Sequence, residues 1–306
     1  MALPLTVTLF YKTAYSGVIS HFNTLSSPTP LDVAFMTRAL LALEPPSIEQ
    51  ARSIISKYAA IIGDNSQRAF KTFSDLNEVL SSNASSLSAA DERDLGNQVS
   101  ALTDAYEAVE EGGEYYDGEQ EQIEVLVATA QHLDQDPLGA LETLQMGKMT
   151  QRNLGSLALG VHLLLLNHRL DLAQKEYETA RQWADDSLVI QLIEASLGLQ
   201  QGGRAAQQAY YVYDEFSSLS ATSEEAKGGR LAAMKLGRGV GLMKRNEWAK
   251  AEESVREAGT VLQQQQEIGT SGLEPLRKDV QADLAVLAIH LNPASKLVNP
   301  GQEFIR

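Results

Sequence analysis

The residues best suited to metal binding or proton transfer in this sequence are its five histidines, His21, His132, His162, His168 and His290. His162 and His168 are the closest pair, and their spacing of six residues places them on different faces of a helix. The chain contains no cysteine, which excludes thiolate ligands and thiol catalysis and fits a reducing compartment. We therefore expect no metal site.

A glycine-rich run, Gly237-Arg238-Gly239-Val240-Gly241, superficially resembles a dinucleotide-binding loop. Such a loop follows a β-strand, whereas this run lies inside an apolar segment with helical periodicity. We interpret these glycines as positions where the helices of a repeat pack closely, because glycine has no Cβ to hold a neighbour away.

Carboxylates are numerous, but pairs such as Asp185-Asp186 and Glu252-Glu253 have the pattern of solvated helix ends and faces. No pair is singled out for general acid–base catalysis. The sequence also lacks a Gly-x4-Gly-Lys-Ser/Thr phosphate loop, a His-Glu-x2-His zinc pair and a Gly-x-Ser-x-Gly nucleophile elbow. We predict that the protein is not an enzyme and has no catalytic residues, no cofactor and no metal.

The chain is strongly acidic, with 25 lysine and arginine residues against 40 aspartate and glutamate residues and a net charge of −15. This charge disfavours direct binding to nucleic acid or to an anionic membrane surface. The longest apolar stretch, Leu154–Leu166, is too short to span a bilayer. The segment Met1–Phe10 has no basic residue before its apolar part, so we expect a first helix or a lead-in rather than a secretory signal. We expect a soluble, cytoplasmic protein that reaches a membrane only through a partner.

Apolar residues recur three and four positions apart along most of the chain, which predicts an all-α fold. Ala173, Tyr177 and Ala180 form a small–large–small triplet whose members share one helical face. Further triplets are Ala140/Leu144/Gly147, Ala209/Tyr213/Phe216 and Ala251/Val255/Ala258, with a weaker copy at Ala51/Ile55/Tyr58. From Ala140 onward the leading alanines are 33, 36 and 42 residues apart. A period of about 34 residues built from two antiparallel helices is the signature of the tetratricopeptide (TPR) repeat.

Each triplet from Ala140 onward follows an apolar helix, which completes the helical pair of a TPR unit. The apolar helices that we predict are Ile123–Leu133, Leu157–Leu166, Leu188–Leu199 and Leu231–Met243, and a last helix spans Val280–Leu291. Loops are predicted at Ser81–Glu92 and Glu110–Glu121, and loop insertions at Gln200–Arg204 and Ser217–Lys227.

The predicted fold class is an all-α, TPR-like helical-repeat solenoid in which antiparallel helix pairs form a right-handed superhelix. One solenoid domain is expected to span residues 1–291, with weakly patterned repeats at 9–110 and well-patterned repeats at 121–291. Residues 292–306 lack periodicity and are predicted to form a C-terminal tail.

The first helix of each pair lines the concave surface of such a solenoid. One helical stripe per unit gives a predicted partner-binding groove of Val125, Thr129, His132, Ala158, His162, Leu165, Gln191, Glu194, Leu236, Val240 and Met243. This groove is mostly apolar and suits an extended or hairpin segment of another protein. Alternatively, these side chains pack within the solenoid. The stripes contain no lysine or arginine, which disfavours a co-chaperone that clamps a C-terminal carboxylate.

The segment Leu157–Glu176, an apolar run that continues into Arg169-Leu170-Asp171, is similar to the central signature of the coatomer epsilon subunit family. Three later segments match that family in the same order, namely Ala209–Glu215, Trp248–Glu253 and Leu284–Leu291. The resemblance, to the fungal type of the family, is close from Ile123 to Leu291 and extends more weakly from Leu9 to Leu80.

This resemblance implies a TPR superhelix that grips the C-terminal domain of the coatomer alpha subunit and meets the beta-prime subunit through the assembled coat. It implies a structural subunit of the COPI coat, without cofactor, in retrograde Golgi-to-endoplasmic-reticulum and intra-Golgi transport. The implied location is the cytoplasm, peripheral on the Golgi membrane and COPI-coated vesicles. Two alternatives stay open: another TPR adaptor or co-chaperone that binds a peptide segment, and an enzyme with an unrecognised all-α site.

Overall fold

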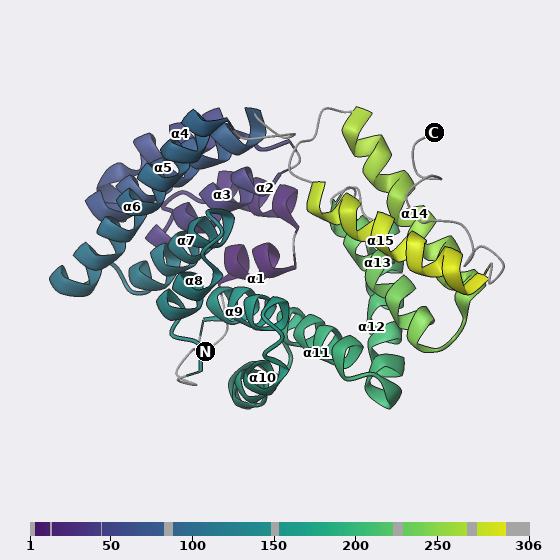
Figure 1. Cartoon of the computed structure of the whole chain (residues 1–306). Helices are drawn as coiled ribbons and strands as arrows, with labels where there is room; N and C mark the ends of the chain where they lie inside the picture. Colours follow the sequence, from purple (N-terminus) through teal and green to yellow (C-terminus); the bar gives the residue numbers. More distant parts are fainter. Residues whose placement is uncertain are drawn as a thin grey trace. The chain divides into compact units, whose positions relative to one another are not determined.

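The computed structural model of the chain describes residues 4–12, 14–43, 45–82, 88–147, 153–222, 229–267 and 274–291 (Figure 1). Within these ranges the chain forms fifteen helices and no strand, which confirms the predicted all-α, helical-repeat fold class. The predicted tail lies outside the described residues. The structure divides into two compact units, Met1–Leu197 and Gly198–Arg306. A single solenoid over residues 1–291 stays a prediction.

The first unit contains α1 to α10 and most of α11. The bounds of these helices are α1 Leu5–Tyr11, α2 Tyr15–Thr24, α3 Pro30–Leu41, α4 Ile48–Lys57, α5 Ala59–Ser82, α6 Ala89–Gly112, α7 Glu119–Leu133, α8 Pro137–Thr143, α9 Leu154–Leu166, α10 Leu170–Ala184 and α11 Leu188–Gln201. The second unit contains the end of α11 and four further helices. They are α12 Gly203–Thr222, α13 Gly229–Lys244, α14 Trp248–Glu267 and α15 Glu274–Leu291. The five apolar helices predicted from the sequence correspond to α7, α9, α11, α13 and α15, so their existence is confirmed.

Polar caps fix the start of several helices. The Thr29 side chain accepts the backbone N–H of Asp32, whose carboxylate in turn accepts the backbone N–H of Thr29, and this capping box opens α3. Ser88 and Asp91 form the same arrangement at the start of α6. Pro137 occupies the first turn of α8, where its missing N–H costs nothing.

The odd-numbered helices of the first unit form a row, which we call the odd-helix row (α1, α3, α5, α7 and α9). Each member packs against the next member, in addition to the contacts between consecutive helices. Packing of alternate as well as successive helices is typical of a solenoid of helical pairs. In the second unit, α13 likewise contacts both α14 and α15.

The small–large–small triplets lie on or directly after the second helices, as predicted. Their leading alanines, Ala140, Ala173, Ala209 and Ala251, are at most 2% exposed. The large members are also buried, with Tyr177 at 4% exposure in the core formed by α9, α10 and α11. The predicted faces of α10, α12 and α14 are therefore confirmed, whereas Gly147, the last member of the first triplet, is exposed and lies beyond the end of α8.

Three turns between paired helices share one hydrogen-bond pattern. The backbone N–H groups of Asp136, Arg169 and Glu247 each donate to the carbonyl oxygen five residues earlier. The residue before each of them has positive φ; these residues are Gln135 at 65°, His168 at 57° and Asn246 at 62°. This is the Schellman geometry of a helix C-terminus. Its recurrence at the same place in three units supports the repeat.

The glycine-rich run lies inside α13 at tight helix contacts. A Cβ on Gly237 would lie 2.6 Å from the Tyr213 ring of α12, and one on Gly239 would lie 2.6 Å from Cγ2 of Val255 in α14. Only glycine fits these positions without a shift of the neighbouring side chain or helix, so the interpretation as packing glycines is confirmed.

The predicted loops are longer than the loops in the structure. Helix α5 covers the first two residues of Ser81–Glu92, and α6 covers its last four, because the Ser88 cap satisfies the first N–H groups of α6. Helix α12 covers the first six residues of the predicted insertion Ser217–Lys227. Residues 83–87 and 223–228 lie outside the described part of the chain.

Two other predicted loops contain a shorter non-helical segment. Within Glu110–Glu121, only residues 113–118 lie outside α6 and α7. Within Gln200–Arg204, only Gly202 separates α11 from α12, because Gly202 and Gly203 both have positive φ and so interrupt the helix.

A buried carboxylate fixes the start of α7. Glu119 is fully buried and accepts hydrogen bonds from the backbone N–H of Ser66 at 3.2 Å, the Ser66 hydroxyl at 2.8 Å and the backbone N–H of Tyr115 at 2.7 Å. Helix α5 is kinked at Gly63, which has φ 76°, and the Tyr115 ring packs directly against this glycine. The kink, the segment 113–118 and the start of α7 therefore form one connected structure.

Candidate partner-binding surface

Phe10 of helix α1 belongs to an aromatic cluster that includes residues of α2 and α3. The Phe10 ring centroid lies 5.1 Å from that of Phe35 in α3 and 5.6 Å from that of Tyr15 in α2. The guanidinium carbon of Arg38 lies 4.8 Å from the centroid of Phe10 and 5.2 Å from the centroid of Phe35. These distances are within the range of cation–π attraction. Arg38 and the rings together hold α1 against α3.

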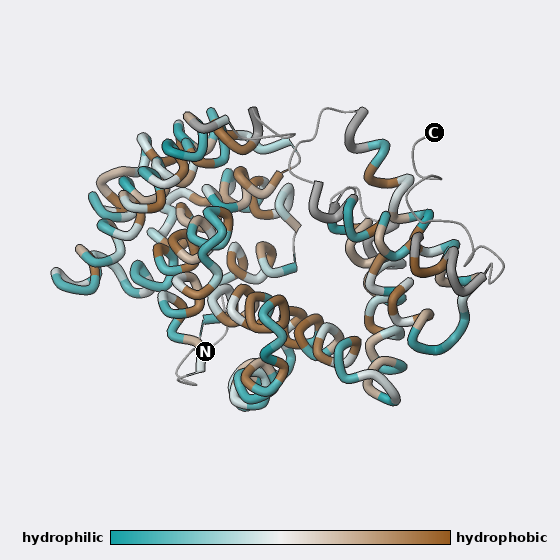
Figure 2. Tube along the Cα trace, viewed as in Figure 1, coloured by the Kyte–Doolittle hydropathy of each residue, from teal (hydrophilic) through white to brown (hydrophobic). Residues whose placement is uncertain are grey.

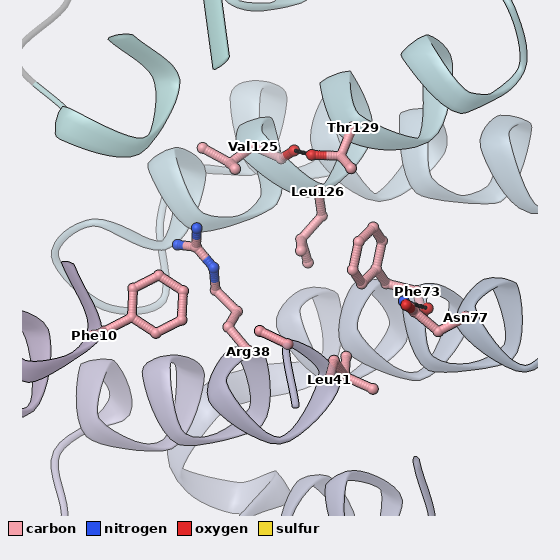
Figure 3. A pocket seen from close by; sticks show the side chains of 9 residues that line it. Phe10, Arg38, Leu41, Phe73, Asn77, Val125, Leu126 and Thr129 are labelled. Carbon is pink, nitrogen blue, oxygen red and sulfur yellow. Dashed lines mark hydrogen bonds between the residues drawn. The ribbon is translucent and has the colours of Figure 1, made fainter. Parts of the chain in front are cut away.

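A cavity of about 250 Å³, the Arg38 pocket, opens among α1, α3, α5 and α7 (Figure 3). Its lining consists of Phe10, Arg38, Leu41, Ala42, Phe73, Asn77, Val125, Leu126 and Thr129. Figure 3 shows Arg38 extending from α3 toward α7, beside the Phe10 ring. Asn77 donates to the carbonyl oxygen of Phe73 at 2.8 Å, and Thr129 donates to that of Val125 at 2.6 Å. Arg38 is the one charged residue among those that line this pocket.

The polar neighbours of Arg38 in the described part of the chain are uncharged side chains, Gln122 and Tyr11. Its Nη1 donates to Oε1 of Gln122 at 2.8 Å, and in the described part of the chain no carboxylate lies within ion-pair distance of it. Burial lowers the pKa of Arg38 from its ordinary value, and the nearby Tyr11 opposes this effect. Burial likewise raises the pKa of Tyr11, with the charge of Arg38 working the other way. A guanidinium nevertheless stays protonated near neutral pH, so the pocket holds one positive charge.

A second cavity of about 300 Å³, the His162 pocket, lies among α1, α2, α9 and α11. Its lining consists of Phe10, Tyr11, Tyr15, Ala158, Val161, His162, Leu165, Val189, Leu192, Ile193 and Ser196. Figure 2 shows that hydrophobic residues dominate α9 and α11. Aromatic and aliphatic side chains with a few polar groups are the usual lining of a site that binds a peptide or small ligand.

The structure brings five of the predicted groove residues to these two pockets. Val125 and Thr129 of α7 line the Arg38 pocket. Ala158, His162 and Leu165 of α9 line the His162 pocket.

The other predicted groove residue of the first two stripes, His132, lies near His162 but outside both pocket linings. His132 is half-buried at the end of α7, and its ring centroid lies 6.4 Å from that of His162. It lines neither pocket.

The predicted stripe on α11 lies beside the pocket rather than in it. Gln191 and Glu194 are exposed, and the His162 pocket takes Leu192 and Ile193 from this helix. Glu194 lies near Tyr177 of α10, whose pKa is raised first by burial and then by this carboxylate.

The predicted stripe on α13 belongs to the second unit. Leu236 is 8% exposed and lies in the core cluster with Val255, and Met243 packs against the same cluster. Val240 is half-buried on the same helix. A binding role for these three residues stays a prediction.

Sequence reasoning missed Phe10, Tyr11 and Arg38. The segment that contains Phe10 and Tyr11 has no repeat pattern, and its aromatic pair was the only available signal. Arg38 follows a run of buried residues in α3 and has the ordinary position of a basic residue in a last helical turn.

Two further properties concern only the residues that the structure describes. No group of three or more histidine, aspartate or glutamate side chains among them is arranged to hold a metal ion. None of their helices combines the length and the apolar character needed to cross a membrane.

These features define a helical-repeat protein with pockets along a row of alternate helices. The sequence model described as "Coatomer epsilon subunit" matches residues 71–269, which is more than half of the chain. The chain therefore belongs to the coatomer epsilon subunit family.

Two curated relatives carry the same description. The chain is 29% identical to the probable coatomer subunit epsilon of Schizosaccharomyces pombe over 77 residues. This aligned region covers 25% of this chain and 27% of that protein. The chain is 28% identical to coatomer subunit epsilon-1 of Arabidopsis thaliana over 144 residues. This aligned region covers 45% of this chain and 40% of that protein. The matches thus span less than half the length of these relatives.

Proposed function

We propose that this protein is a structural subunit of the COPI coat and binds the C-terminal domain of the coatomer alpha subunit. The observation that carries the proposal is the family match over residues 71–269, which covers α7, α9 and α11. These helices supply walls of the Arg38 pocket and the His162 pocket. The role is structural and not enzymatic.

The binding mechanism follows from the apolar character of the His162 pocket. An extended or hairpin segment of the alpha subunit would place apolar side chains between α9, α11 and the aromatic residues of α1 and α2. Removal of apolar area from water is the main favourable contribution in such a contact. A few residues at the centre would contribute most of the affinity, and the half-buried aliphatic lining residues Leu165, Val189 and Leu192 are available for this contact.

The wider role follows from the same family membership. The protein would act in the cytoplasm, peripherally on the Golgi membrane and on COPI-coated vesicles, in retrograde Golgi-to-endoplasmic-reticulum and intra-Golgi transport. A net charge of −15 disfavours direct binding to an anionic membrane, so the assembled coat would carry the protein there. Contact with the beta-prime subunit would also arise through the coat.

Co-expression with the C-terminal domain of the alpha subunit from the same organism tests this proposal. We expect size-exclusion chromatography to give a stoichiometric complex that survives high salt, because an apolar contact is weakly screened. Two separate peaks, with this protein still folded and helical, would show that it does not bind the alpha-subunit domain and would contradict the proposal. Another TPR adaptor role would then be the better explanation, and an unbiased pull-down would be the next step.

A paired substitution tests the position of the contact. His162 is exposed and Leu165 is half-buried, and both line the His162 pocket. We expect His162→Asp with Leu165→Asp to abolish the complex while helicity stays unchanged, since a partner would cover the new charges. Leu165 also packs against the core formed by α9, α10 and α11, so the free variant should melt at a somewhat lower temperature. The matched control is Asn97→Asp with Ser100→Asp, which adds the same charges to exposed positions of α6. Normal binding by the His162/Leu165 variant would show that the partner binds elsewhere.

A further inference from the structure

We propose that Arg38 anchors the partner segment by binding the carboxylate of one aspartate or glutamate side chain within an otherwise apolar sequence. This inference rests on the proposed function and names the chemistry of the partner at the Arg38 pocket.

The first observation is the way in which Arg38 is held. The rings of Phe10 and Phe35 lie 4.8 Å and 5.2 Å from the guanidinium carbon, which restricts the plane of the group. A guanidinium has five N–H donors; the hydrogen bond to Gln122 uses one donor on Nη1, and the hydroxyl of Tyr11 interacts with the same group. A guanidinium in a fixed plane is prepared to bind a carboxylate through two parallel hydrogen bonds.

The second observation is the polarity of the pocket. Its other polar side chains, Asn77 and Thr129, donate to carbonyl oxygens of their own helices, and no acidic residue lines it. A positive charge removed from water without a counter-ion is unfavourable, and an incoming carboxylate relieves this cost. The apolar lining from Phe73 and Leu126 favours an aliphatic neighbour on either side of that carboxylate.

The third observation is the charge of the whole chain. With 40 acidic residues against 25 basic residues, most of the surface repels a carboxylate. One positive charge inside an apolar pocket then accepts an acidic side chain at a defined place between α3 and α7. Such a contact fixes the register of the partner segment more than it adds general attraction.

Isothermal titration with the alpha-subunit domain tests the role of Arg38. Arg38→Met keeps a long unbranched side chain and removes the charge, and we expect the complex to be weaker by about 30-fold or more. Arg68→Met is the matched control, because Arg68 is exposed on α5 and lines neither pocket, and its affinity should equal that of the wild type. Wild-type affinity of Arg38→Met would overturn the proposal. Failure of the wild-type protein itself to bind would instead reject the proposed function, and the chromatography shows this before any variant is made.

A second measurement does not depend on the stability of Arg38→Met. Each aspartate and glutamate of the bound alpha-subunit segment is replaced in turn by asparagine or glutamine. We expect one such variant to bind the wild-type protein about 30-fold more weakly than the unchanged segment does. If no amide variant binds more weakly, Arg38 recognises no carboxylate and the proposal is wrong.

Discussion

Alanine substitutions in the glycine seam, which consists of Gly237, Gly239 and Gly241 of α13, test how closely three helices of the second unit pack. A Cβ on Gly237 would lie 2.6 Å from two ring atoms of Tyr213, and a Cβ on Gly239 would lie 2.6 Å from Cγ2 of Val255. Two carbon atoms in favourable contact are about 3.5–4.0 Å apart. Either substitution therefore forces the side chain of Tyr213 or Val255, or the helix that carries it, to move.

The expected change in the free energy of unfolding combines two opposing effects. Replacement of glycine by alanine inside a helix ordinarily stabilises it by about 1 kcal/mol. Overpacking of a filled core costs about 1–3 kcal/mol, so we expect Gly237→Ala and Gly239→Ala to destabilise the second unit by about 1 kcal/mol net. Gly259 of α14 is the matched control, because its Cβ would meet Cγ1 of Val280 at an ordinary 3.4 Å. We expect Gly259→Ala to stabilise the same unit by about 1 kcal/mol.

Urea unfolding followed by tryptophan fluorescence separates these outcomes. The chain has two tryptophans, and Trp248 packs against the core of the second unit, so a Trp183→Phe background restricts the signal to that unit. The difference between seam and control variants corresponds to about 1 M in the urea midpoint for a slope of about 2 kcal/mol per molar. If Gly237→Ala and Gly239→Ala raise the midpoint as Gly259→Ala does, the close approach of α12, α13 and α14 is refuted.

Two further predictions concern buried or half-buried carboxylates. Glu119→Ala removes the acceptor of hydrogen bonds from Ser66 and Tyr115. We therefore expect thermal unfolding to show that the free energy of unfolding of the first unit falls by about 3 kcal/mol. Glu111→Ala, at an exposed position of α6, should change the same melting curve little, and equal effects of the two would contradict the argument. Burial, and then a nearby negative charge, raises the pKa of Asp283 in α15 from 3.8 to about 6. The folded state thus binds the proton more tightly, and stability falls as the pH rises from about 4 to about 6. We expect Asp283→Asn to match the wild type below this range and to be more stable by about 1 kcal/mol above it, after allowance for solvent screening, and a stability difference independent of pH would contradict the assignment.

The faces of the second helices could be predicted because their packing restricts residue size. In α10, Ala173 and Ala180 are at most 1% exposed, and Tyr177 fills the space between them and the neighbouring helices. Where the backbone of a neighbouring helix approaches closely, the residue must be small, and a small residue at regular spacing can be recognised in a single sequence. The glycine seam left the same kind of signal, and its interpretation was correct for the same reason.

The helix ends could not be predicted to the residue. Gln135 and His168 adopt positive φ at the end of their helices, where glycine or asparagine is usual, so residue type did not mark these turns. The Ser88–Asp91 capping box had a recognisable Ser-x-x-Asp pattern, but the serine-rich composition around it indicated a loop. Local composition misled where the capping hydrogen bonds decided the structure.

The Arg38 pocket could not be predicted from the sequence because its walls come from distant parts of the chain. Arg38 and Gln122 are 84 residues apart, and Phe10 comes from a segment without any repeat pattern. Helix α3 is buried almost throughout, from Asp32 to Thr37 and from Ala39 to Leu41, so no single apolar stripe marked its remaining face. The repeat pattern identifies which helices share a row, and only the packed structure shows which side chains meet between them.

The isolated protein and the complex allow two explanations of Arg38 to be separated. If the cation–π contacts with Phe10 and Phe35 and the bond to Gln122 serve only to fasten α1, the charge stabilises the free protein and Arg38→Met lowers its melting temperature. If the charge serves to recognise a carboxylate, the free protein bears an uncompensated cation in a largely apolar pocket. Its replacement by an apolar side chain of similar length is then neutral or stabilising, and the loss is confined to the complex. The melting temperature of the free variant and its affinity for the partner therefore change in different ways under the two explanations. The two measurements together decide whether Arg38 stabilises the packing of α1 or recognises a carboxylate of the partner.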